Sequence, residues 1–210
     1  LRIWLKEISP MVWRRLLIKD TYTIADLHYC LQISFAWSDS HLHQFIIYGK
    51  AYGLYYAGGM HFSDDANQVY LDQFQLRLNE RFIYQYNFND DWEYELRLEK
   101  ILPINTKYEY PLCSAGNRTA PPEDCGGPEA FMALFEQNQS HYSLEWRLLD
   151  LVEDYKNGEK DLEGFTEGIE GLHYWATAHK FDKKSTNRKL KKYFSNANRC
   201  DISIEEVIDE

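Results

Sequence analysis

Two histidines, His41 and His43, stand two positions apart in a stretch that predicts a β-strand. Alternate residues of a strand point to the same side, so the two imidazoles could share a metal ion. Cys113 and Cys125, in a later proline-rich stretch, would complete a ligand set that suits zinc; carboxylate ligands would suit zinc or manganese. The spacing matches no compact zinc-finger pattern, and the alternative is that both histidines pack structurally beside neighbouring aromatic residues.

A second candidate for chemistry is Cys125, which directly precedes Gly126-Gly127-Pro128 and a predicted helix. Unpaired amides at a helix N-terminus stabilise a thiolate, so this cysteine could act as a nucleophile with a histidine nearby. The structural alternative is a loop held by packing or by a disulfide between Cys113 and Cys125, with glycines required for the backbone geometry. The sequence favours this structural alternative.

Carboxylates also gather around Asp90 and Asp91, where a pair of them could support acid–base catalysis. Glu93 and Glu95, however, fall on the polar face of a predicted hairpin, and aspartates are ordinary turn residues. We therefore expect a binding pocket near the hairpin tip and the proline-rich loop rather than a catalytic pair. The candidate pocket residues are Asp90, Asp91, Trp92, Glu123 and Asp124.

These residues need elements to position them, and the clearest is an aromatic hairpin over residues 82–98. Aromatic and aliphatic residues alternate with polar ones along both halves, which predicts two strands with one apolar face. This hairpin lacks a glycine in its connection, so asparagine or aspartate must take any left-handed position in the turn.

Further strands are predicted at 1–8, 13–18, 41–48 and 51–56, and helices at 24–36, from 128 onward, and at 144–155. Residues 103–128 hold five of the six prolines and are predicted to form a long loop. Strands come first and helices mostly later, which favours an α+β fold in which an antiparallel sheet packs against the helices. We expect one main domain over residues 1–150 and a helical, charge-segregated extension over 151–210 packed on it.

Charge limits the classes of partner. The chain of 210 residues carries 23 lysines and arginines against 33 aspartates and glutamates, a net charge of −10 that disfavours a general nucleic-acid surface. The exception is a basic segment over residues 180–192, for which the alternatives are a solvated helix face and a nucleic-acid contact. Its candidate contacts are Lys183, Lys184, Arg188, Lys189, Lys191 and Lys192.

The four cysteines are too few for a disulfide scaffold in a chain of this size, which fits a reducing cytoplasm. No apolar run approaches the ~20 residues of a membrane-spanning helix, so we expect no membrane partner. Neither a phosphate-binding loop nor a dinucleotide fingerprint occurs.

Four stretches resemble, in order, successive motifs of the plasmid pRiA4b ORF-3-like family and cover most of residues 1–135. They are Ile8-Ser-Pro-Met-Val-Trp-Arg-Arg-Leu16, Trp37-Ser-Asp-Ser-His-Leu-His-Gln-Phe45, Tyr86-Asn-Phe-Asn-Asp-Asp-Trp-Glu-Tyr-Glu95 and Ala120-Pro-Pro-Glu-Asp-Cys-Gly-Gly-Pro128. The resemblance implies an α+β fold and an association with plasmids and other mobile elements, but no established activity. Some members carry a resolvase label, yet this chain shows no arginine-framed serine nucleophile.

The sequence therefore favours a non-enzymatic binding or interaction module with an unidentified protein or small-molecule partner. The alternatives are a metal-dependent hydrolase or nuclease that uses His41 and His43, and nucleic-acid binding through residues 180–192.

Overall fold

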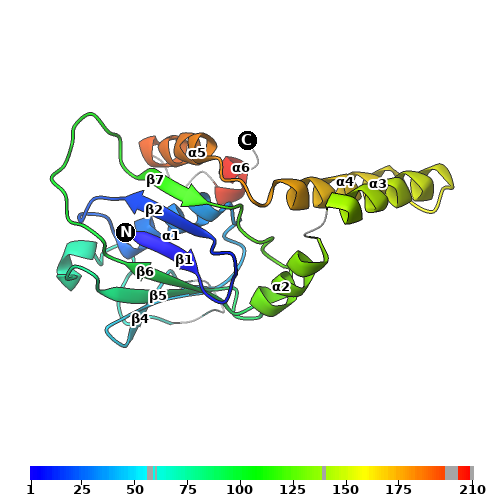
Figure 1. The fold of residues 1–210 in the computed structure, drawn as a ribbon. Helices are drawn as coiled ribbons and strands as arrows, with labels where there is room; N and C mark the ends of the chain where they lie inside the picture. Colours follow the sequence, from blue (N-terminus) through cyan, green and yellow to red (C-terminus); the bar gives the residue numbers. More distant parts are fainter. Residues whose placement is uncertain (56–58, 60, 139–140, 197–202, 209–210) are drawn as a thin grey trace.

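The computed structural model describes residues 1–55, 59, 61–138, 141–196 and 203–208 (Figure 1). In these ranges seven strands form one sheet in the order β4-β3-β5-β6-β1-β2-β7, and every neighbouring pair is antiparallel. The strands are β1 (Arg2–Leu5), β2 (Trp13–Leu17), β3 (His43–Ile47), β4 (Lys50–Tyr52), β5 (Arg81–Tyr86), β6 (Trp92–Arg97) and β7 (Leu112–Asn117). The helices are α1 (Ile24–Phe35), the short 3-10 helix η1 (Leu71–Phe74), α2 (Gly127–Gln137), α3 (His141–Lys156), α4 (Leu162–Thr177), α5 (Lys183–Ser195) and α6 (Ile204–Ile208). The predicted α+β class is confirmed.

The aromatic hairpin forms the centre of the sheet as β5 and β6. Tyr84 pairs with Tyr94, and both side chains are buried on the inner face, with exposures of 0% and 1%. Each large apolar side chain buried in this way contributes about 1.5–3 kcal/mol, so the hairpin register is strongly fixed. The glycine-free turn places Asn87 (φ 51°) and Asp91 (φ 53°) in the left-handed region, as the sequence requires.

Helix α1 covers the inner face of the sheet. Its N-terminus is fixed by a capping box in which Thr23 and Asp26 exchange hydrogen bonds, and Ala36 ends it in a left-handed conformation. Most of its residues are buried, including three polar ones, His28, Gln32 and Ser34. Buried polar side chains need partners, and His28 and Gln32 find theirs in the site described below.

The predicted loop over 103–128 is wrong in part, because it contains the edge strand β7. This strand pairs with β2, with Leu16 opposite Cys113, and a register shift separates Arg15 from Leu16. The predicted strand over 51–56 is shorter, since β4 ends at Tyr52; Tyr56 lies outside the described residues.

The C-terminal helices take two positions. Helices α3 and α4 pair as a helical hairpin that projects to the right of the sheet in Figure 1, whereas α5 returns to pack on β7 and α1. The boundary predicted at residue 150 falls inside α3. Residues 197–202 and 209–210 of the predicted extension lie outside the described chain.

Candidate functional site

Residues 120–127, here called the tip segment, lie across the end of the β5–β6 hairpin. Two buried tryptophans hold the backbone of this segment: Trp37 Nε1 donates to the carbonyl of Pro121 at 2.9 Å, and Trp92 Nε1 donates to the carbonyl of Glu123 at 3.1 Å. The hairpin tip and the proline-rich stretch, distant in sequence, are therefore neighbours. Trp92 itself is fully buried, so it supports the surface from below and does not line a pocket.

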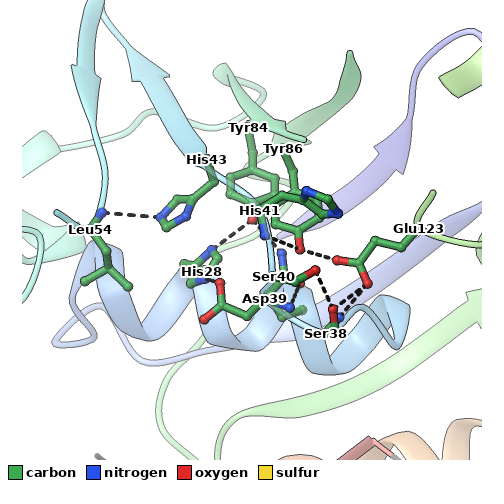
Figure 2. A network of polar contacts seen from close by, with 11 residues as sticks. His28, Ser38, Asp39, Ser40, His41, His43, Leu54, Tyr84, Tyr86 and Glu123 are labelled. Carbon is green, nitrogen blue, oxygen red and sulfur yellow. Dashed lines mark hydrogen bonds and ion pairs between the residues drawn. The ribbon is translucent and has the colours of Figure 1, made fainter. Parts of the chain in front are cut away.

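The carboxylate of Glu123 links three elements (Figure 2). Its Oε1 accepts a hydrogen bond from the Tyr86 hydroxyl, and its Oε2 accepts from the backbone N–H and the hydroxyl of Ser38, both at 2.8 Å. Burial and this bond to Glu123 raise the pKa of Tyr86, so its hydroxyl remains a donor. Glu123 thus acts as a structural bridge between the tip segment, β5 and the loop that follows α1.

The carboxylate of Asp124 is held through one oxygen, whereas that of Glu123 is held through both. Its Oδ1 lies 2.8 Å from His41 Nε2 and accepts a hydrogen bond from Asn87 Nδ2 at 3.2 Å, yet the Asp124 side chain is 70% exposed. Asn87 is buried, with an exposure of 2%. The result is a carboxylate that is oriented by two protein groups while much of its surface faces water.

Asp90 fixes the start of α2. Its Oδ2 accepts a hydrogen bond from the N–H of Gly126 at 3.0 Å. Gly127 has φ 81°, and a Cβ at this position would lie 2.2 Å from the carbonyl oxygen of Asp90. Only glycine permits this approach, which explains the glycine at position 127.

The surroundings of the Cys125 thiol disfavour the nucleophilic alternative. Burial raises its pKa to about 11, and the neighbouring Asp90 carboxylate adds to the increase. The protonated form is therefore favoured, opposite to what a reactive cysteine requires.

A second polar layer lies beneath the tip segment, between α1 and the sheet (Figure 2). His28 Nε2 lies 2.7 Å from Asp39 Oδ1, and His28 Nδ1 lies 2.8 Å from the Tyr84 hydroxyl, which also accepts from Gln32 Nε2 at 2.8 Å. Since a carboxylate only accepts, His28 donates from Nε2 to Asp39. Asp39, with φ 63°, is held by its N–H bond to Gln32 Oε1.

His43 completes this layer. Its ring stacks on His28 with centroids 3.6 Å apart and planes 12° apart, and its Nε2 accepts a hydrogen bond from the N–H of Leu54 at 3.3 Å. Burial lowers the pKa of His43 well below its usual value, and His28 lowers it further. His43 is therefore neutral, with its proton on Nδ1.

His28, Asp39 and His43 form the group of metal-ligand side chains that the described residues bring together, with their ligand atoms within 4.8 Å of one another. Their hydrogen bonds do not fit zinc as they stand. A His43 that accepts at Nε2 carries its proton on Nδ1, which leaves no lone pair for a metal. In addition, parallel rings 3.6 Å apart aim their lone pairs along separate planes instead of at one point.

The four predicted metal ligands are not gathered into one such group. His43 faces His28, and His41 faces Asp124. Cys113 is buried on β7, where its N–H donates to Asn187 Oδ1 at 2.7 Å. Both Cys113 and Cys125 are free thiols, so hydrogen bonds, and not a disulfide, hold the tip segment.

The basic candidates lie on α5, away from this site. Lys191 pairs with Glu109 at 2.7 Å, Lys183 reaches the carbonyl of Ser114 at 3.5 Å, and Lys189 donates to the carbonyl of Ile208. Arg188 and Lys192 also have interaction partners, whereas Lys184 is exposed near the N-terminus of the helix. Part of the positive charge predicted for nucleic acid thus serves the fold.

Sequence reasoning missed His28, Gln32, Asp39 and Tyr84. A signal was present, because His28 and Gln32 lie four residues apart, beside Leu27 and Leu31, on the face of α1 that must be buried. Two polar side chains on an apolar helix face indicate a buried hydrogen-bond network.

Comparisons with known proteins place this geometry in a family. The chain is 31% identical over 154 residues to the uncharacterized protein y4hQ of Sinorhizobium fredii, a match that covers 70% of this chain and 78% of that protein. A crystal structure of a protein of unknown function, MM3350 from Methanosarcina mazei Go1, superimposes with a TM-score of 0.59 at 34% identity, over 69% of this chain and 85% of the other.

Neither name states a ligand or an activity. Within the described residues, no helix is both long and apolar enough to cross a membrane. The sequence model of the plasmid pRiA4b ORF-3-like protein family matches residues 1–164 of this chain, which include the tip segment, the hairpin and the polar layer. The chain therefore belongs to the plasmid pRiA4b ORF-3-like protein family.

Proposed function

We propose that this protein is a binding module, and that it recognises a cationic partner through the tip surface, defined as the carboxylates of Asp90, Asp91 and Asp124. The observation that carries the proposal is the state of Asp124, which is held by His41 and Asn87 but remains 70% exposed. An oriented and accessible carboxylate loses little freedom on binding.

Charge supports a cationic partner. In the described part of the chain, no lysine or arginine forms an ion pair with Asp90, Asp91 or Asp124. The net charge of −10 adds a long-range attraction for basic groups. A lysine- or arginine-rich peptide is the partner class that this surface fits.

The side chains that could take part in catalysis, Tyr84 and Cys125, are in states that support binding over catalysis. Tyr84, at the end of the Asp39–His28 chain of hydrogen bonds, is fully buried, so a substrate could not reach it in this conformation. Cys125 holds its proton firmly, with a pKa of about 11. The free thiols of Cys113 and Cys125 support a reducing compartment such as the cytoplasm as the place of action.

Titration calorimetry with an oligolysine peptide as the probe tests this proposal. We expect the double variant Asp91→Asn, Asp124→Asn to lose at least about tenfold in affinity, since charged contacts contribute about 1.5–3 kcal/mol each. Asparagine at position 124 can still accept the hydrogen bond from Asn87 Nδ2, which protects the fold.

The matched control is Glu163→Gln, Glu167→Gln on the exposed surface of α4, which changes the net charge by the same amount. If both double variants bind oligolysine equally, or if the unmodified protein does not bind it, the tip surface is not the site.

A further inference from the structure

The connection between β6 and β7 leaves the sheet as a long arm, residues 99–110, visible at the left of Figure 1. Four apolar side chains on this arm face water: Ile101 is 72% exposed, Leu102 58%, Ile104 65% and Tyr108 51%. Clustered exposure of this kind marks an interaction surface more often than chance.

The arm forms one wall of a groove with a volume of about 820 Å³. The opposite walls are apolar and come from the end of β2 and from the region of η1, with Leu17, Ile18, Leu71 and Leu76 among the lining residues. A protruding apolar segment and an apolar groove thus lie side by side on one molecule.

The arm backbone is also available. Among the described residues, no backbone hydrogen bond is formed by residues 100–104, while Asn105 bonds within the arm, to Tyr110 and Tyr108. Extended backbone with unused donors and acceptors can pair with another extended segment.

The charges that line the groove are balanced. Lys19 and Lys100 stand against Asp20 and Asp72, and none of the four forms an ion pair within the described residues. A two-fold axis would let the lysines of one copy approach the aspartates of the other. Further exposed apolar side chains lie on the α3–α4 hairpin, where residues 150–170 hold eight acids and two lysines and would repel a second copy.

We propose that this groove is a self-association surface, on which two copies of the chain exchange arms about a two-fold axis. The apolar side chains of each arm enter the groove of the other copy. The four exposed side chains and the apolar walls of the groove together supply the surface for the ~800 Å² that each partner buries in a standard interface.

Sedimentation velocity over about 1–100 µM, a range that brackets a micromolar Kd, tests the proposal. We expect a concentration-dependent dimer, and the variant Ile101→Ser, Ile104→Ser should dissociate at least about tenfold more readily with an unchanged melting temperature. The control Leu162→Ser, at a 65% exposed leucine of α4, should associate like the unmodified chain.

Three results would overturn the proposal: a monomer at every concentration, a dimer that survives the arm variant, or a dimer that the α4 variant disrupts equally. A monomer whose groove nevertheless binds an apolar dye, with loss of binding in the arm variant, would assign the groove to a different ligand. The variant Asp91→Asn, Asp124→Asn should remain dimeric, which separates this surface from the tip surface.

Discussion

Cys125 shows how the surroundings of one residue decide its chemistry. At pH 8 a thiol with a pKa of about 11 is ionised to about one part in a thousand, compared with about a quarter for an ordinary thiol. We therefore expect iodoacetamide to alkylate Cys125 in the folded protein at least about 100-fold more slowly than in the denatured chain. Peptide mass spectrometry measures both rates at this one position.

The control for this prediction is Asp90→Asn, which removes a carboxylate that raises the thiol pKa and should therefore speed the reaction. The rate in the unmodified protein should rise about tenfold per pH unit up to about pH 10. Equal rates in the folded and denatured chains at pH 8 would contradict the protonated state.

His43 provides a pH dependence with a definite sign. The unfolded chain binds a proton at this histidine near its usual pKa of 6.5, whereas the folded chain, with a depressed pKa, does not. Stability from the neutral form is complete above pH 6.5 and falls as pH drops, by up to about 1.4 kcal/mol per unit. The ionisable side chains that face His43 are His28 and Tyr84, and Asp39 is hydrogen-bonded to His28.

Urea unfolding of the protein and of His43→Phe between about pH 7.5 and pH 5 isolates this contribution. The variant should be less stable at pH 7.5, because the N–H of Leu54 loses its acceptor, and the difference should shrink as pH falls. Parallel profiles would show that His43 is protonated in the folded state.

Site residues were predictable only where their sequence context was local. The hairpin tip was predictable, because Asp90 and Asp91 interrupt a strict alternation of apolar and polar side chains. The pairing of His43 with His28 was not, since it depends on how α1 crosses the sheet. Nothing in the spacing of His41 and His43 distinguishes a shared ligand from two separate partners.

Among the elements, the hairpin was the most predictable and β7 the least. Strands β5 and β6 alternate apolar and polar residues, which fixes the side chains that face the core, and the turn between the strands then sets the register. The β7 sequence, Leu112 to Asn117, lacks such alternation and follows Pro111. It becomes a strand because β2 offers a free edge, which is information from a distant part of the chain.

The α3–α4 hairpin contains a matched pair of glycines for a stability prediction. A Cβ on Gly168 would lie 2.6 Å from Leu151 Cδ1, whereas one on Gly171 meets nothing within 4 Å. Alanine raises helix stability by about 0.8–1 kcal/mol relative to glycine. We expect Gly171→Ala to raise the free energy of unfolding by most of this amount. Gly168→Ala should not show the gain, because displacing the buried Leu151 costs about 1–3 kcal/mol.

Thermal and urea unfolding of the two variants checks the difference. Helix propensity is common to both, so only the contact with Leu151 separates them. An equal gain for both would mean that α3 and α4 do not approach at Gly168.

At the scale of the whole molecule, the net charge of −10 acts on the two proposed surfaces in opposite directions. It attracts a cationic probe to the tip surface, but it repels a second copy. Raising NaCl from about 0.02 M to about 0.3 M shortens the Debye length from roughly 20 Å to about 6 Å. Oligolysine binding should therefore weaken in calorimetry, while the dimer fraction in sedimentation should rise. A dimer that dissociates when salt is added would mean that lysine–aspartate contacts, and not the apolar arm, hold the two copies together. An oligolysine affinity that does not change with salt would remove the electrostatic basis of the proposed function.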